Sequence, residues 1–305
     1  MRLDVALVRA HPGLSRRKAR EVIEKGQVTV DGATSLDAGR AVAGTERIEW
    51  DANRPARRRA RSSLPLLYED DQILVVDKPA GLLSVPSSPD ARDEDTVLAR
   101  VRDYVRHRRP RRPYVGVVHR LDRDTSGALA FALDPATRDA LRSLFRHHRI
   151  ERRYLALVAG APRGDQGEVD LPLRDEYEGG RRGVARPGEA SRPALTRWRV
   201  VERFPGAALL EVGLQTGRQH QIRVHLAHVG LPVLGDDVYG RDVRAPVAAR
   251  RQMLHAQRLG LTHPGTGRSL EVESPLPPDF ARALDALRAR ATQRTPRTRR
   301  ERREP

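Results

Sequence analysis

VGVVHRLDRDTSG, residues 115–127, joins a short apolar run to a segment in which one carboxylate, Asp122, stands between Arg120 and Arg123. An apolar run of this length is typical of a buried strand. Opposite charges nearby would keep Asp122 ionised, and the end of a strand would fix its direction better than a mobile loop. This is how a nucleophile or a general base is built. The same spacing also fits a salt-bridged surface turn closed by Ser126-Gly127, so other segments have to decide.

Short apolar segments dominate the sequence around this run. We expect strands at Ile73–Val76, Val115–Val118, Ala128–Leu133, Tyr154–Ala159 and Ala208–Leu214. Helices are expected from Asp134-Pro135 to about His147, and around His220 to near Gly230, whose flexibility suits a helix C-terminus. Strands and helices without a regular alternation predict an α+β fold with a largely antiparallel sheet.

The first 52 residues form a separate pattern. Leu3, Leu7 and Val8 have helical spacing, Ser15 is placed to cap a second helix, and Val28–Gly32 looks like a strand entering a tight turn. On the second helix the basic residues Arg16, Arg17 and Arg20 lie away from the apolar stripe. This order resembles the alpha-L RNA-binding module that ribosomal protein S-four contains, although a solvated charged helix on a small structural domain has the same pattern.

Composition points to a polyanionic partner. The chain has 305 residues, a formal charge of +17 from 57 basic and 40 acidic residues, and only three lysines among the basic ones. Neutralising phosphates releases counterions, so nucleic acid is the expected partner. The sequence contains no run of ~20 apolar residues and no secretory signal, which predicts a soluble cytoplasmic protein without a membrane partner. Because there is no cysteine, thiolate chemistry and cysteine-bound zinc are excluded.

The length exceeds the usual size of one domain. We expect a small domain at 1–52, a basic linker at 53–63, a larger domain at 64–288 and a basic disordered tail at 289–305. Nothing in the sequence reports the oligomeric state, and a monomer is the default.

Three ordered motifs resemble those of the RluA-type pseudouridine synthases, which isomerise uridine in structured RNA. They are HRLDRDTSG at 119–127, RIERRYLALV at 149–158 and QTGRQHQIRVH at 215–225. The segments VVDKPAGL at 75–82, LHA at 254–256 and HP at 263–264 add to the resemblance, which spans roughly 64 to 280. It implies the pseudouridine synthase fold, with a bent mixed sheet and the active cleft on one face.

The resemblance also implies site residues. Asp122 would be the nucleophilic carboxylate, Arg223 would pair with it, and Tyr154 would stack on the uracil and help to take the C5 proton. Arg120 would fill the space that the flipped base leaves in the RNA, and Arg218 and His220 would contact RNA. Taken singly, Arg223 also fits a phosphate-facing helix residue, Tyr154 a core residue and Arg120 a salt bridge.

A metal site is not expected. His220, His225 and His228 have a spacing that suggests one, but no acidic or cysteine partner shares it, and the reaction needs neither metal nor cofactor. Arg152 stands where the family usually has a lysine. We therefore expect an isomerase acting on RNA, with large-subunit ribosomal RNA as the first choice of substrate.

Three alternatives remain at this point. They are a transfer-RNA synthase, a noncatalytic ribosome-assembly factor on the same fold, and a glycosidase-like hydrolase, for which a second carboxylate is missing near Asp122.

Overall fold

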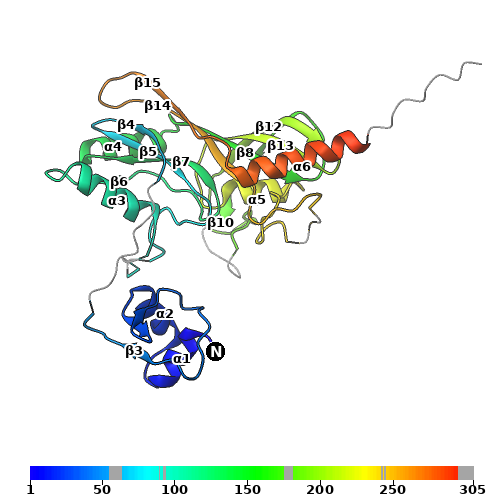
Figure 1. Cartoon of the computed structure of the whole chain (residues 1–305). Helices are drawn as coiled ribbons and strands as arrows, with labels where there is room; N and C mark the ends of the chain where they lie inside the picture. The colour runs from blue at the N-terminus through cyan, green and yellow to red at the C-terminus, as the bar shows by residue number, and fades with distance from the viewer. Residues whose placement is uncertain are drawn as a thin grey trace, which may run out of the picture. The chain divides into compact units, whose positions relative to one another are not determined.

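A computed structural model describes residues 1–54, 64–88, 90–91, 94–174, 181–241, 243 and 245–294 of the chain (Figure 1). Contacts divide it into two compact units, Met1–Ser62 and Ser63–Pro305. Most of the basic linker expected at 53–63 lies outside the described residues, as do residues 295–305 of the expected tail.

The first unit contains two helices and a three-stranded sheet in the order β2-β1-β3. Its elements are α1 (Leu3–Ala10), α2 (Arg16–Glu24), β1 (Val28–Val30), β2 (Ala33–Thr34) and β3 (Ile48–Trp50). The Ser15 side chain accepts a hydrogen bond from the Lys18 N–H and caps α2, as expected. Asp31 and Gly32 both have positive φ, 50° and 78°, which matches the tight turn between β1 and β2.

In the second unit, ten described strands form one sheet with the path β4-β5-β7-β14-β8-β13-β12-β9, while β15 pairs with β14 and β6 with β7. β14 runs parallel to β7, and the other neighbouring strands described in this sheet run antiparallel. The strands are β4 (Leu66–Glu69), β5 (Ile73–Lys78), β6 (Gly116–Val117), β7 (Ser126–Ala132), β8 (Glu151–Ala159), β9 (Gln166–Asp170), β12 (Leu195–Phe204), β13 (Ala207–Leu214), β14 (Leu254–Thr262) and β15 (Ser269–Glu273). A separate pair joins β10 (Leu173–Arg174) to β11 (Ser191–Arg192). The predicted α+β fold with a largely antiparallel mixed sheet is confirmed.

Helices cover both faces of this sheet, and strand β8 shows how. Its residues alternate: Tyr154, Ala156 and Val158 pack in the cluster that contains residues of α3 (Val97–Arg108) and α5 (Gln221–His228). Leu155 and Leu157 pack with Phe280 and Leu284 of α6 (Pro278–Arg294) instead (Figure 1). Successive strand residues point to opposite faces, so both faces of a central strand become apolar when both are covered.

The predicted helix from Asp134-Pro135 is α4 (Pro135–Arg146), with Asp134 accepting a hydrogen bond from the Thr137 N–H as its cap. Several boundaries differ from expectation; β8, for example, begins at Glu151 and not at Tyr154. β6 covers only Gly116–Val117, because it pairs with β7 alone at this point. α6 continues to Arg294, beyond the expected start of the tail at 289, because Leu287 and Ala291 extend its apolar face by one further turn.

Candidate active site

The loop between β6 and β7 presents Asp122. On its N-terminal side, the Ser84 hydroxyl accepts from the Leu121 N–H at 3.0 Å and donates to the Leu121 carbonyl at 2.7 Å. On its C-terminal side, the Thr125 N–H donates to the Asp122 carbonyl at 3.2 Å and closes a turn. The backbone is therefore fixed on both sides of the carboxylate.

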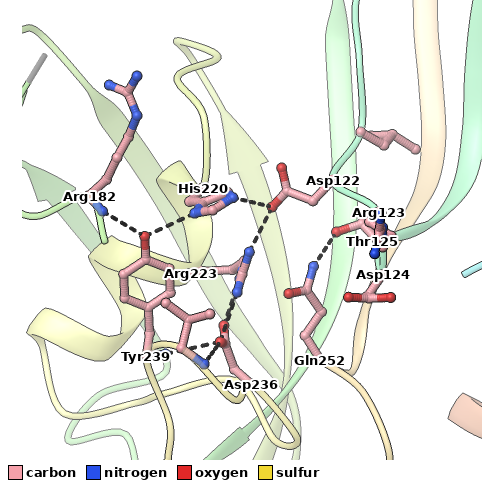
Figure 2. Close-up of polar contacts among 12 residues, drawn as sticks. Asp122, Arg123, Asp124, Thr125, Arg182, His220, Arg223, Asp236, Tyr239 and Gln252 are labelled. Atoms are coloured by element: carbon pink, nitrogen blue, oxygen red, sulfur yellow. Dashed lines mark hydrogen bonds and ion pairs between the residues drawn. The ribbon is translucent and has the colours of Figure 1, made fainter. Parts of the chain in front are cut away.

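Residues from distant segments hold the rest of this loop. The buried Lys78 ammonium donates to the Arg123 carbonyl at 2.7 Å, and Arg251 Nη1 donates to the Asp124 carbonyl at 2.9 Å. Gln252 Nε2 donates to the Thr125 hydroxyl at 2.7 Å (Figure 2). β7 then begins beside β14, and its second residue is Gly127, whose φ is +120°; a Cβ there would lie 2.2 Å from the Ala256 carbonyl oxygen. Only glycine fits this close approach.

Arg223, on α5, joins two carboxylates. Its Nη1 donates to Asp122 Oδ2 at 3.2 Å, while Nε and Nη2 donate to the two oxygens of Asp236 at 2.7 and 2.9 Å (Figure 2). The Asp236 side chain is wholly buried and also accepts from the N–H groups of Val238 and Tyr239. Burial alone would raise the pKa of Asp236, but the Arg223 guanidinium outweighs burial and lowers it. Asp236 thus fixes the guanidinium that anchors Asp122.

The anchoring of Asp122 is one-sided. Among the described residues, Arg223 is the hydrogen-bond donor to this carboxylate, and it uses Oδ2. No described residue donates to Oδ1, and Figure 2 shows this second oxygen directed away from Arg223 and His220. The neighbouring Arg120 and Arg123 are exposed and, within the described chain, form no ion pair with Asp122. The arginine that contacts Asp122 is instead Arg223, which lies 101 residues further along the chain.

His220 lies at the same carboxylate, with Nε2 3.9 Å from Asp122 Oδ2. It is the residue before α5 and has a φ of +58°, a left-handed conformation that is strained for a residue with a side chain. Its Nδ1 lies 2.9 Å from the Tyr239 hydroxyl, which accepts from the Arg182 N–H. Burial lowers the pKa of His220, although the charge of Asp122 opposes the shift. The sequence suggested only an RNA contact here, and the structure adds a contact to the carboxylate.

A cavity of about 440 Å³ opens over this carboxylate. It brings together the six residues predicted in this unit: Arg120, Asp122, Tyr154, Arg218, His220 and Arg223. The Tyr154 side chain projects from β8 into the cavity wall, burial raises its pKa, and no described residue hydrogen-bonds its hydroxyl. Phe145, Arg146 and His148, at the end of α4, also line the cavity. The sequence analysis missed them, although the resemblance placed its second motif directly after them.

Arg152 forms part of the same wall. Its Nη2 donates to the carbonyls of Leu214 and Gln215, both at 3.2 Å, and its Nη1 lies where a Cβ on Gly217 would approach to 2.5 Å. The remaining predicted arginines lie in the first unit. All three are exposed there, and Arg16 and Arg20 each donate from Nε to Asp4.

The described residues contain no cluster of His, Asp or Glu side chains that could hold a metal ion. The His225 ring nitrogens instead lie 2.9 Å from the Thr196 hydroxyl and 2.9 Å from the Leu171 carbonyl. No described helix has the length and apolar character needed to cross a membrane.

Comparison with known proteins identifies the family. The sequence model of the RNA pseudouridylate synthases matches residues 72–228, and that of the S4 domain matches residues 1–48. Ribosomal large subunit pseudouridine synthase D of Nitrosomonas europaea is 38% identical over 299 residues, which cover 94% of this chain and 85% of the relative. The chain belongs to the RNA pseudouridylate synthase family. The enzyme is an RNA pseudouridine synthase, an isomerase, and it carries an RNA-binding S4 domain.

Further relatives agree with this assignment to the pseudouridine synthases. Ribosomal large subunit pseudouridine synthase D of Pseudomonas aeruginosa is 36% identical, covering 94% of this chain and 92% of the relative. The solved structure of human RNA Pseudouridylate Synthase Domain Containing 4 shares the fold, with a TM-score of 0.60, 24% identity, and coverage of 73% of this chain and 93% of that one.

Proposed function

We propose that this pseudouridine synthase isomerises uridines in large-subunit ribosomal RNA and that Asp122 is its nucleophile. The observation that carries the proposal is the one-sided anchoring of Asp122: Oδ2 is tied to Arg223 while Oδ1 has no described donor and lies at a cavity. The curated relatives from Nitrosomonas and Pseudomonas are named as ribosomal large subunit enzymes, which favours this RNA. Transfer RNA is the alternative substrate.

The chemistry requires no net change in atoms. The bond from uracil N1 to ribose C1′ breaks, the base turns within the cavity, C1′ bonds to C5, C5 loses its proton and N1 gains one. Asp122 supplies the nucleophilic carboxylate, whether it attacks C1′, adds to C6 or takes a proton from C2′. Tyr154 stacks on the base, and its hydroxyl, without a described partner, takes part in removing the C5 proton.

RNA must present its uridine outside the helical stack. The exposed Arg120 fills the vacated position, because a planar guanidinium can stack between bases and meet phosphate. Arg218 and His220 contact the RNA at the cavity, and Arg16, Arg17 and Arg20 contact phosphates in the S4 domain. The protein acts as a cytoplasmic monomer built from an S4 domain at 1–52, a linker and a catalytic domain that starts at 64.

Tritium release tests the proposal. The purified protein is incubated with unmodified ribosomal RNA and transfer RNA transcripts that carry tritium at uracil C5. We expect release from the large-subunit transcript and none with Asp122→Asn. Asp124→Asn, which changes the neighbouring carboxylate of the same loop, is the matched control and retains release. Release from transfer RNA alone would overturn the substrate, and undiminished release by Asp122→Asn would overturn the nucleophile.

A further inference from the structure

The S4 domain contains a carboxylate that the reaction does not use. Asp4, in the first turn of α1, has a fully buried side chain although it is charged. Burial alone would raise the pKa of Asp4, but hydrogen bonds from Arg20, Arg16 and Arg2 outweigh it and lower the pKa to about 2. The group is therefore an anion throughout the physiological range.

All three arginines reach Asp4 through the same atom. Arg2 Nε donates to Oδ1 at 3.2 Å, and the Nε atoms of Arg16 and Arg20 donate to Oδ2 at 3.1 and 2.8 Å. Within the described residues, their terminal Nη1 and Nη2 groups make no hydrogen bond. The three side chains are 53, 54 and 47% exposed, so these outer edges face solvent.

This arrangement leaves three guanidinium groups ready to bind anions. Each keeps its Nη pair, which can donate two parallel hydrogen bonds to a phosphate. The backbone that bears this carboxylate is also fixed, because the Asp4 N–H donates to the Ala38 carbonyl and the neighbouring Leu3 side chain is fully buried in the core. The fixed Asp4 anion thus orders three long side chains before RNA binds, so less rotamer entropy is lost on binding.

We propose that Asp4 is a positioning residue that gathers Arg2, Arg16 and Arg20 into one binding surface for RNA phosphates. The inference rests on the proposed action on RNA and deepens it. It adds Arg2 to the phosphate-binding residues and gives Arg2, Arg16 and Arg20 a shared anchor. The partner is the RNA backbone, because three cations around one buried anion leave an excess of positive charge at the surface.

The direction in which one substitution changes the affinity for RNA distinguishes this positioning role from simple electrostatics. Asp4→Asn removes a negative charge close to a polyanion, so on charge alone RNA binding should tighten. If Asp4 positions the arginines, binding should weaken instead, because the amide nitrogen that replaces one oxygen cannot accept from Nε. The two accounts predict opposite changes.

The experiment uses the full chain and filter binding to an unmodified large-subunit ribosomal RNA transcript over a range of salt concentrations. We expect Asp4→Asn to weaken binding by at least about threefold, with a shallower salt dependence because fewer phosphates are neutralised together. Binding equal to or tighter than that of the wild type, with an unchanged thermal unfolding profile, would overturn the proposal.

A second pair of variants decides the matter if Asp4→Asn unfolds the domain. Arg16→Lys combined with Arg20→Lys keeps the charge, but an ammonium cannot hold Asp4 through one edge and a phosphate through another. We expect weaker binding of a similar size. Arg9→Lys combined with Arg47→Lys is the matched control, because both arginines are exposed in the same domain and make no described contact with Asp4, and it should bind as the wild type does. If the Arg16 and Arg20 double variant binds like that control, Asp4 does not position an RNA-binding surface.

Tritium release keeps this test apart from that of the proposed function. At saturating RNA, Asp4→Asn should release tritium at the wild-type rate, since the chemistry lies in the other unit. If the wild type releases no tritium from any RNA, the proposed substrate fails, whereas the binding comparison still judges Asp4.

Discussion

Arg223 holds two carboxylates whose substitution should affect stability very differently, and Asp236→Asn should cost the more stability. Asp236 is wholly buried, Arg223 is 6% exposed, and their two hydrogen bonds measure 2.7 and 2.9 Å. Removing one partner of a buried pair costs about 3–5 kcal/mol, because the other charge stays buried. Asparagine keeps the shape and Asp122 remains as a second anion, so we expect the lower end, about 3 kcal/mol.

That loss is measurable by calorimetry. For a domain of this size, 1 kcal/mol shifts Tm by about 2–4 °C, so the catalytic domain should melt about 6–12 °C lower in Asp236→Asn. The guanidinium loses its anchor and misplaces Asp122, and a displacement of 1 Å at a reacting group can cost about 100-fold in rate. Single-turnover tritium release should therefore also slow markedly.

Asp122→Asn is the comparison. Its side chain is 19% exposed and takes one hydrogen bond of 3.2 Å from an arginine that keeps its other partner. We expect a stability change below about 1 kcal/mol and no turnover. Our reasoning would be refuted if Asp236→Asn melted within about 2 °C of the wild type, or if Asp122→Asn lost as much stability as Asp236→Asn.

Three further predictions concern single residues. Gly127→Ala should lower the free energy of unfolding by about 3 kcal/mol or more in urea. The new Cβ would lie 2.2 Å from the Ala256 carbonyl oxygen, and the φ of +120° is strained for alanine. A change below about 1 kcal/mol would contradict this close approach. Burial lowers the pKa of Lys78 to about 7 from 10.5, so between these pH values the unfolded chain binds a proton that the folded chain does not. The free energy of unfolding should therefore rise with pH across that window, by up to about 1.4 kcal/mol per pH unit. Urea unfolding at pH 7 and 9.5 should show a smaller rise in Lys78→Met than in the wild type, and an equal rise would argue against the shift. Tyr154→Phe keeps the ring but loses the hydroxyl, so tritium release should slow by about 100-fold or more if that group takes part in proton removal, whereas a rate within about threefold would leave stacking as its role.

Local signals in the sequence predicted much of the fold. Ser15 and Asp134 cap helices where expected, and the apolar runs became strands of one sheet. These features depend on neighbours within a few residues, so the local sequence contains the information. The motif resemblance likewise predicted six residues that meet at one cavity.

The missed features depend on contacts between distant segments. Asp236 is one such residue, because nothing in its neighbours along the chain indicates that its side chain is buried against Arg223. Asp4 gave no signal either, since its partners include two arginines on a different helix. The positive φ of His220 could not be predicted from the residue type, because His148 shares it while the other histidines do not.

The difference between local signals and contacts from distant segments also explains why the motif around Asp122 is ambiguous when taken alone. Its flanking arginines suggest a salt-bridged turn, yet the charge that reaches Asp122 comes from α5, and its loop is held by Ser84, Lys78 and Gln252. These groups lie in segments that only the sheet topology brings together. A short peptide with this motif would form none of these contacts, so the orientation of the carboxylate is a property of the whole catalytic domain. Substitutions that loosen its core should therefore reduce turnover even where they touch no residue of the cavity.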